Sequence, residues 1–182
     1  GTNRHGAICM SDPDYTDTEL MITRAALELR NDDTVLVGVG VPNLACNLAK
    51  RTHASDLQMV YESGTVDSNP DALPLSIGDP VLATGARSIG PMYDGFSRYL
   101  QGGRIDVGFL GGAQIDKQGN INSTVIGEYD DPKVRLPGSG GACEISSNAH
   151  RTLIITPHQK RRFPDEVDFI TAHRDLLALL GF

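Results

Sequence analysis

Residues 34–43 read TVLVGVGVPN and carry the strongest structural signal in the sequence. The first six form a continuous apolar run of strand length, which is typical of a strand buried on both faces of a parallel sheet. Pro42 and Asn43 then open a short helix through Leu48, and residues 57–61, LQMVY, form the next strand. This succession predicts a βαβ unit with two parallel strands.

The segments on either side of this unit extend the same pattern. Thr16 and Glu19 have the spacing of a capping box, which predicts a helix over residues 17–30. Residues 67–91 mix prolines and glycines with short apolar runs, which predicts loops with brief strands. The other expected elements are a helix over 96–100, strands over 105–110, 121–126, 151–156 and 167–171, a turn over 117–120 that makes a hairpin, and a short helix over 176–180.

These elements together predict an α/β fold with an open, mostly parallel sheet flanked by helices, and with one β-hairpin. We expect a single domain over residues 15–182, preceded by a flexible tail over residues 1–14. The sequence is 40% hydrophobic and 21% charged, which is typical of a globular domain. No apolar run approaches the roughly 18 residues that a membrane span needs, so no span is expected.

Charge and cysteine content disfavour several classes of function. The formal net charge is −7 and the basic residues cluster only at 160–162, which argues against a nucleic-acid partner. The three cysteines are odd in number and lack CxxC spacing, so a reducing, cytoplasmic compartment is expected. The histidines lack the i, i+4 spacing of a metal-binding helix, and no serine stands in a GxSxG motif. We therefore expect neither a metal site nor a serine hydrolase.

Glu62 is the first candidate for chemistry. It belongs to the segment YESG at residues 61–64, directly after a predicted parallel strand. Open α/β sheets present their functional groups at the carboxyl ends of such strands. The alternative is that a glutamate beside Ser-Gly is an ordinary solvent-exposed turn residue. The segment by itself does not decide between the two.

Three glycine clusters accompany it. The first, GVGVP at 38–42, lies between a strand and a helix, so its backbone could approach a phosphate or an acyl group. It lacks the third glycine of a dinucleotide-binding GxGxxG motif, and no GK[ST] motif occurs in the sequence. The other two, GGAQ at 111–114 and GSGGA at 138–142, fit either tight turns or an oxyanion hole made of backbone N–H groups.

In order and spacing, these segments resemble those of the B chain in glutaconate-type class I CoA-transferases. The matching segments are GVGVP at 38–42, YESG at 61–64, GGAQID at 111–116 with GNIN at 119–122, and GSGGA at 138–142. The similarity extends from about residue 15 to residue 171. The resemblance implies an open α/β fold, an active site shared by A-type and B-type subunits, and a covalent glutamyl-CoA intermediate.

The resemblance also implies roles for individual residues. Glu62 matches the nucleophilic glutamate of the family, and Gly141 matches the glycine whose backbone N–H stabilises the oxyanion. The segments that line the CoA and acyl pocket contain Gly38, Gly40, Gln114 and Gly140. Because a glutamate is ionised at neutral pH, this mechanism needs no general base.

The implied activity is the transfer of CoA between an acyl-CoA and a carboxylic acid, in a hetero-oligomer with an A-type subunit. Coenzyme A takes part as the acyl-CoA co-substrate. One alternative is an acyl-CoA hydrolase on the same scaffold, including enzymes that open cyclic CoA-linked ketones, which tend to lack a glutamate at the position of Glu62. Another is a non-catalytic partner subunit that keeps the fold. The family's B-type subunits usually continue beyond the segment matching residues 167–171, so we expect their carboxyl-terminal elements to be missing or replaced here.

Overall fold

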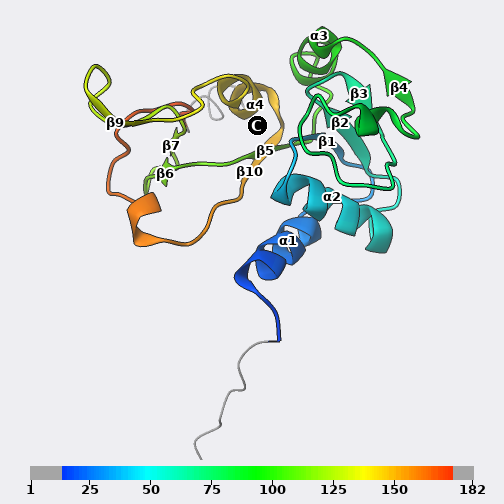
Figure 1. The fold of residues 1–182 in the computed structure, drawn as a ribbon, viewed down its shortest axis with the longest axis horizontal. Helices are drawn as coiled ribbons and strands as arrows, with labels where there is room; N and C mark the ends of the chain where they lie inside the picture. Colours follow the sequence, from blue (N-terminus) through cyan, green and yellow to red (C-terminus); the bar gives the residue numbers. More distant parts are fainter. Residues whose placement is uncertain (1–13, 174–182) are drawn as a thin grey trace, which may run out of the picture.

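A six-stranded sheet with the strand order β10-β5-β1-β2-β3-β4 forms the centre of the fold (Figure 1). The structure, a computed structural model, describes residues 14–173. The parallel strands are β10 (Arg151–Ile154), β5 (Val107–Leu110), β1 (Thr34–Val37) and β2 (Gln58–Tyr61). The short strands β3 (Thr65–Val66) and β4 (Ser88–Ile89) continue the sheet in antiparallel pairs. The prediction of an open, mostly parallel sheet is therefore confirmed.

Helices cover both faces of this sheet (Figure 1). On one face, α1 (Asp17–Leu27) and α2 (Val41–Thr52) pack against Val35 and Val37 of β1. Leu36 belongs to the core on the opposite face, which is covered by α4 (Ala142–Asn148) and by the π-helix η2 (Gly95–Leu100) that follows α3 (Met92–Asp94). Because both faces of β1 are buried, its sequence is an unbroken apolar run.

The direction in which the chain adds strands to the sheet reverses between β1 and β5. From β1 the chain passes through α2 to β2 on one side, whereas α4 leads into β10 on the other side of β5. Since α2 and α4 lie on opposite faces, the carboxyl ends of β1 and β5 flank the point where open α/β sheets form a crevice. Residues 38 and 111, the first after these two strands, lie at this point.

Helix α1 begins with the predicted capping box. The Thr16 hydroxyl accepts a hydrogen bond from Glu19 N at 3.2 Å, and Glu19 Oε2 accepts one from Thr16 N at 2.7 Å. The helix ends at Leu27, three residues before the predicted boundary. Within residues 14–173, no helix combines the length and the apolar character that crossing a membrane requires.

The predicted strand over residues 121–126 is two strands in two different hairpins. β7 (Ile121–Asn122) pairs with β6 (Gln114–Ile115), which confirms a hairpin around residues 117–120, and β8 (Val125–Gly127) pairs with β9 (Pro132–Arg135). The Asn122 side chain causes the break. Its Oδ1 accepts hydrogen bonds from Thr124 N and Val125 N, and its Nδ2 donates to Val125 O, which turns the backbone between the two strands.

The prediction of a strand over residues 167–171 is wrong. This segment makes only one isolated bridge at its end, between Ala172 and Ile121. Asp168 bonds instead to the Gln114 side chain and to Gly127 N, and Thr171 N donates to Ile121 O, so these separate contacts hold the segment and no ladder forms along it. In residues 67–91 the expected loops with brief strands are confirmed by β4, and the structure adds the 3-10 helix η1 (Pro80–Ala83) there. A second 3-10 helix, η3 (Lys160–Arg162), follows β10. The predicted helix over 176–180 and nearly all of the 1–14 tail lie outside the described residues.

Candidate active site

Glu62 stands on a tight turn at the carboxyl end of β2. Gly64 N donates to Tyr61 O at 2.9 Å, and the chain returns immediately as β3, with Val60 paired to Val66. Gly64 has a φ of +91°, and a Cβ atom there would lie 2.4 Å from the carbonyl oxygens of Gly90 and Pro91. Only glycine fits this position, and the resulting turn places Glu62 at its tip.

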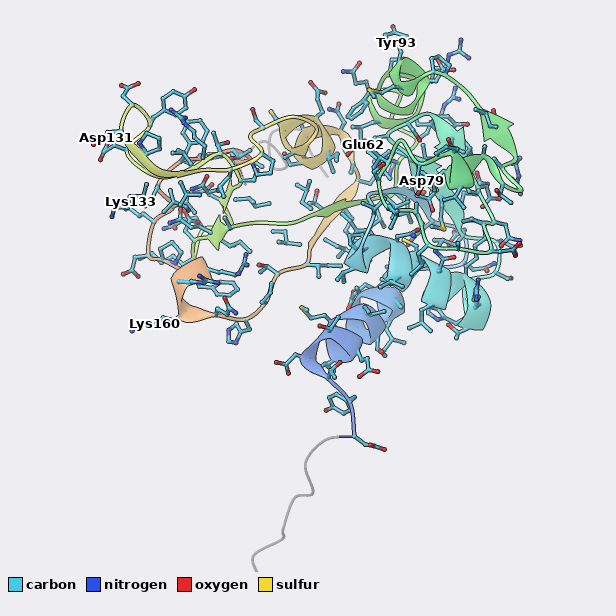
Figure 2. The ribbon with its side chains drawn as sticks, viewed as in Figure 1. Glu62, Asp79, Tyr93, Asp131, Lys133 and Lys160 are labelled. Atoms are coloured by element: carbon cyan, nitrogen blue, oxygen red, sulfur yellow. The ribbon has the colours of Figure 1, made fainter. Side chains whose placement is uncertain are left out.

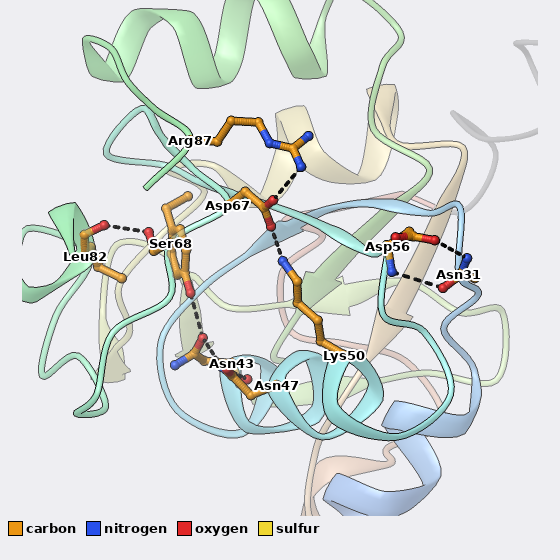
Figure 3. A network of polar contacts seen from close by, with 10 residues as sticks. Asn31, Asn43, Asn47, Lys50, Asp56, Asp67, Ser68, Leu82 and Arg87 are labelled. Atoms are coloured by element: carbon orange, nitrogen blue, oxygen red, sulfur yellow. Dashed lines mark hydrogen bonds and ion pairs between the residues drawn. The ribbon is translucent and has the colours of Figure 1, made fainter. Parts of the chain in front are cut away.

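The strand beneath Glu62 is anchored to α2. Tyr61 is buried, and its hydroxyl donates to Asn43 Oδ1 at 2.8 Å. On the returning side, Asp67 has a φ of +54° and pairs with Lys50 of α2 and with Arg87 (Figure 3). These contacts join β2, β3 and α2, and they give the turn that carries Glu62 a firm support.

Glu62 lines a pocket of about 190 Å³ at the carboxyl edge of the sheet. The walls come from the ends of β1, β2 and β5, the residue after β7, the loop before α4, and α4 itself. The lining residues are Leu36, Val37, Gly38, Glu62, Phe109, Leu110, Gly111, Ser123, Pro137, Gly138, Gly140, Ala142 and Ile145. Figure 2 shows Glu62 near the centre of the molecule, between α4 and the α3 helix.

Gly141 lies directly opposite the Glu62 carboxylate. A Cβ atom added at Gly141 would stand 3.4 Å from Glu62 Oε1 and 3.8 Å from Cζ of Phe96. Gly141 is the N-cap of α4 and has a φ of +77°. Among residues 14–173, the backbone N–H of Gly141 has no protein acceptor. Such a donor can serve an oxygen atom that develops negative charge beside Glu62.

Helix α4 is held close enough for this contact by Gly108 of β5. A Cβ atom at residue 108 would lie 2.4 Å from Cγ2 of Ile145, so only glycine lets α4 lie this near the sheet. Gly95 of η2 plays a similar part on the other side, where a Cβ atom would lie 3.2 Å from Tyr61 O. The Glu62 turn is therefore enclosed between two helices.

Burial raises the pKa of Glu62 above its ordinary value. Within residues 14–173, Glu62 takes part in no ion pair, so no cation offsets the loss of hydration. A partly desolvated carboxylate without a counter-charge is a better nucleophile than one fully hydrated in water. The geometry and the pKa shift both suit attack by this oxygen.

The other predicted site residues are divided between the pocket and the framework. Gly38 and Gly140 line the pocket with Glu62. Gly40 caps α2 with a φ of +84° and is not part of the lining. Gln114 lies in the interior, where Oε1 accepts from Asn122 Nδ2 at 2.7 Å and Nε2 donates to Asp168 Oδ2 at 3.1 Å. Its placement favours a structural role, and its binding of CoA stays a prediction.

Gly111 and Ser123 are among the pocket residues that the sequence did not single out. Gly111 begins the GGAQ cluster, and the cluster was the available signal for it. Ser123 carries no local motif. Its place follows from hydrogen bonds to the loop before α4, since its Oγ donates to Gly138 O at 3.1 Å and its carbonyl accepts from Gly138 N at 2.9 Å.

In the described part of the chain, no group of three or more His, Cys, Asp or Glu side chains could hold a metal ion. The polar groups at the pocket are the carboxylate of Glu62, the hydroxyl of Ser123 and the backbone of the glycine loop before α4.

Comparison with known proteins identifies the family. The family model described as coenzyme A transferase matches residues 18–179. The chain is 49% identical over 175 residues to the B-type subunit of 3-oxoadipate CoA-transferase from Pseudomonas knackmussii, covering 92% of this chain and 67% of the relative. It is 39% identical over 162 residues to the B-type subunit of glutaconate CoA-transferase from Acidaminococcus fermentans, covering 87% of this chain and 60% of the relative.

The structure leads to the same family. It superimposes on the crystal structure of glutaconate coenzyme A-transferase from Acidaminococcus fermentans with a TM-score of 0.80 and 38% identity, covering 90% of this chain and 64% of that one. This chain thus spans about two thirds of the length of these relatives. The family model matches nearly the whole length of this chain, and Glu62 and the glycine loop before α4 lie at one pocket. The chain therefore belongs to the coenzyme A transferase family.

Proposed function

We propose that Glu62 is the nucleophile of a class I CoA-transferase and forms a covalent glutamyl-CoA intermediate. The observation that carries this proposal is the position of Gly141, whose Cβ, if present, would lie 3.4 Å from Glu62 Oε1. The Glu62 carboxylate therefore lies beside the Gly141 backbone, whose N–H has no acceptor among residues 14–173. A carbonyl group placed there meets both its nucleophile and the donor for its developing negative charge.

The reaction proceeds by two exchanges on acyl carbon. A Glu62 carboxylate oxygen attacks the thioester carbonyl, and the tetrahedral oxyanion accepts a hydrogen bond from Gly141 N. The C–S bond breaks and CoA leaves as a thiolate, which gives a mixed anhydride. The thiolate then attacks the glutamyl carbonyl, releases the first acid as a carboxylate and leaves glutamyl-CoA. A second carboxylate reverses both steps, which returns free Glu62 and gives the new acyl-CoA.

The raised pKa of Glu62 supports this role. Attack needs the ionised form, and partial burial keeps its oxygen less shielded by water than that of an exposed glutamate. No proton transfer is needed in either exchange, because carboxylate and thiolate are the leaving groups. This agrees with a pocket whose described lining contains no histidine or lysine.

The active enzyme is a hetero-oligomer with an A-type subunit. The relatives with 49% and 39% identity are both named as B-type subunits, which supports a second kind of chain. The pocket of this chain holds about 190 Å³, whereas sites for ligands of drug size usually hold about 300–1,000 Å³. Much of the CoA moiety must therefore bind elsewhere. Residues 15–182 act as one domain of this assembly, in the cytoplasm, as the cysteine pattern predicts.

The test is to trap the intermediate on the complex of this chain with its A-type subunit. The complex is incubated with an acyl-CoA, treated with hydroxylamine, and digested for mass spectrometry. We expect a hydroxamate on Glu62 alone, no label in Glu62→Gln, and full labelling in Glu128→Gln, which changes an exposed glutamate outside the pocket lining. Turnover by Glu62→Gln would disprove the nucleophilic role. Continued release of free acid beyond one equivalent per Glu62, without an acceptor carboxylate, would favour the hydrolase alternative.

A further inference from the structure

Gly111 occupies a position that no residue within 14–173 requires to be glycine. A Cβ atom at this residue would have no heavy atom of the described residues within 4 Å, and its φ lies outside the left-handed region that favours glycine. Neither packing nor backbone conformation therefore excludes a side chain. Gly38, across the crevice at the end of β1, has the same two properties. Both residues line the Glu62 pocket.

The backbone around Gly111 is held from both sides. Leu110 O accepts a hydrogen bond from Ile155 N at 3.0 Å. Gly112 O accepts from Thr156 Oγ1 at 3.1 Å and from Arg162 Nη1 at 3.0 Å. A methyl group at residue 111 could not swing away with the backbone, so it would stay in the open space beside this lining residue.

That volume is small, and most of the side chains that line it are apolar, while Glu62, Ser123 and backbone groups make its exposed surface more polar than apolar. Apart from Glu62 and Ser123, the pocket is lined by backbone and by apolar side chains such as Phe109, Leu110 and Ile145. A methyl group is close in size to a water molecule, whose share of liquid volume is about 30 Å³. This is a sizeable part of a pocket of about 190 Å³. The described lining also contains no Lys or Arg that could neutralise a charged acyl group.

We propose that Gly111 is a specificity-determining residue that keeps room beside Glu62 for the uncharged carbon atoms next to the thioester of the acyl group. This inference rests on the proposed function, because it assumes that the thioester carbonyl lies at Glu62. A methyl group more or less in an apolar pocket changes discrimination between substrates by about 10- to 200-fold. Filling the position should therefore penalise bulky acyl groups selectively.

The test measures binding in the complex with the A-type subunit, in the Glu62→Gln background so that no reaction occurs. Dissociation constants are measured by calorimetry for CoA, acetyl-CoA, butyryl-CoA and benzoyl-CoA, with and without Gly111→Ala. We expect the values for CoA to agree within about twofold and the value for benzoyl-CoA to rise at least tenfold. Gly78→Ala is the matched control, because Gly78 is also exposed, lacks a left-handed φ and has its nearest atom 3.9 Å from an added Cβ.

An equal change for CoA and for all three acyl-CoAs would overturn the inference, and so would unchanged affinity for benzoyl-CoA. Loss of folding in Gly111→Ala would also overturn it, because the open space at this position would then be wrong. The trapping experiment at Glu62 is independent of these results. If Glu62 is labelled but Gly111→Ala changes all four affinities equally or not at all, only the role of Gly111 is contradicted. If Gly111→Ala weakens benzoyl-CoA selectively but Glu62 is not labelled, only the covalent mechanism is contradicted.

Discussion

The Glu62 carboxylate and the Gly141 backbone face one another, such that a Cβ atom at residue 141 would stand 3.4 Å from Oε1. The two residues come from the turn after β2 and from the N-cap of α4. Each is held by a close helix–sheet contact, at Gly95 on one side and Gly108 on the other. The distance between them depends on how tightly these helices pack.

Gly141→Ala should damage both stability and catalysis. The φ of +77° would cost an alanine about 1–2 kcal/mol, and the new methyl group would occupy the space between the carboxylate and the amide. We expect the rate of CoA transfer to fall by about 10²- to 10³-fold, as for loss of an oxyanion donor. Gly140→Ala is the control for stability, since it has open space and no left-handed φ. Equal melting temperatures of the two variants would contradict the strain at residue 141.

Glu62→Gln should change stability in a pH-dependent way. Because burial raises the pKa of Glu62 in the folded state above its value in the unfolded chain, ionisation of Glu62 destabilises the folded state at neutral and alkaline pH. The gain in stability of Glu62→Gln over wild type should therefore be largest at neutral and alkaline pH. This gain should decline as the pH falls through the raised pKa, and it should level off once Glu62 is protonated in both the folded and the unfolded wild-type chain. Urea denaturation across pH 4–8 measures this, and a pH-independent difference would refute the desolvation of Glu62.

Ser123→Ala should slow the reaction while leaving CoA binding intact. The hydroxyl donates to Gly138 O at 3.1 Å and so fixes the loop that leads to Gly141. Loss of one such hydrogen bond is worth about 0.5–1.5 kcal/mol, which corresponds to a fall in kcat of up to about tenfold. Ser147→Ala, which removes a hydroxyl of α4 that bonds to Cys143 O outside the pocket lining, should have no effect. An altered KM for acyl-CoA with unchanged kcat would show that Ser123 contacts substrate and does not position the loop.

Asp67→Asn should lower stability without abolishing the chemistry. The Asp67 side chain is mostly buried and pairs with Lys50 and Arg87, and asparagine tolerates the φ of +54°. Only the charge is removed, so we expect the free energy of unfolding to fall by about 1–3 kcal/mol. Asp71→Asn, at an exposed residue, is the control. Urea denaturation at low and high salt checks the result, and an identical midpoint for both variants would show that these ion pairs do not stabilise the turn region.

Local patterns predicted the parts of the fold that depend on local physics. The apolar run at 34–39 and the strand at 57–61 indicate burial on both faces of a sheet, and both strands formed with a helix between them. Thr16 and Glu19 interact across three residues, so the start of α1 could be read directly from the sequence. Glu62 could be placed at a strand end for the same reason.

Other elements depend on partners far away in the chain. Helix α4 is only seven residues long and follows a glycine-rich loop, and its position rests on contact with Gly108. The segment 167–171 has an apolar pattern of strand type, but Asp168 is held by Gln114 across 54 residues. The same contact holds the Gln114 amide in the interior of the protein. No property of the GGAQ segment predicted this position.

The sequence by itself determined the parallel strands, the helices beside them and a carboxylate at the end of β2, because hydrophobic periodicity and turn residues act over a few positions. Only the tertiary structure decided that Gly141 faces this carboxylate and that Gly111 and Ser123 share its pocket. These residues are brought together by α4 and η2, which pack closely at Gly108 and Gly95 on one face of the sheet. Such packing depends on the shapes of segments distant in the chain, which local patterns do not encode.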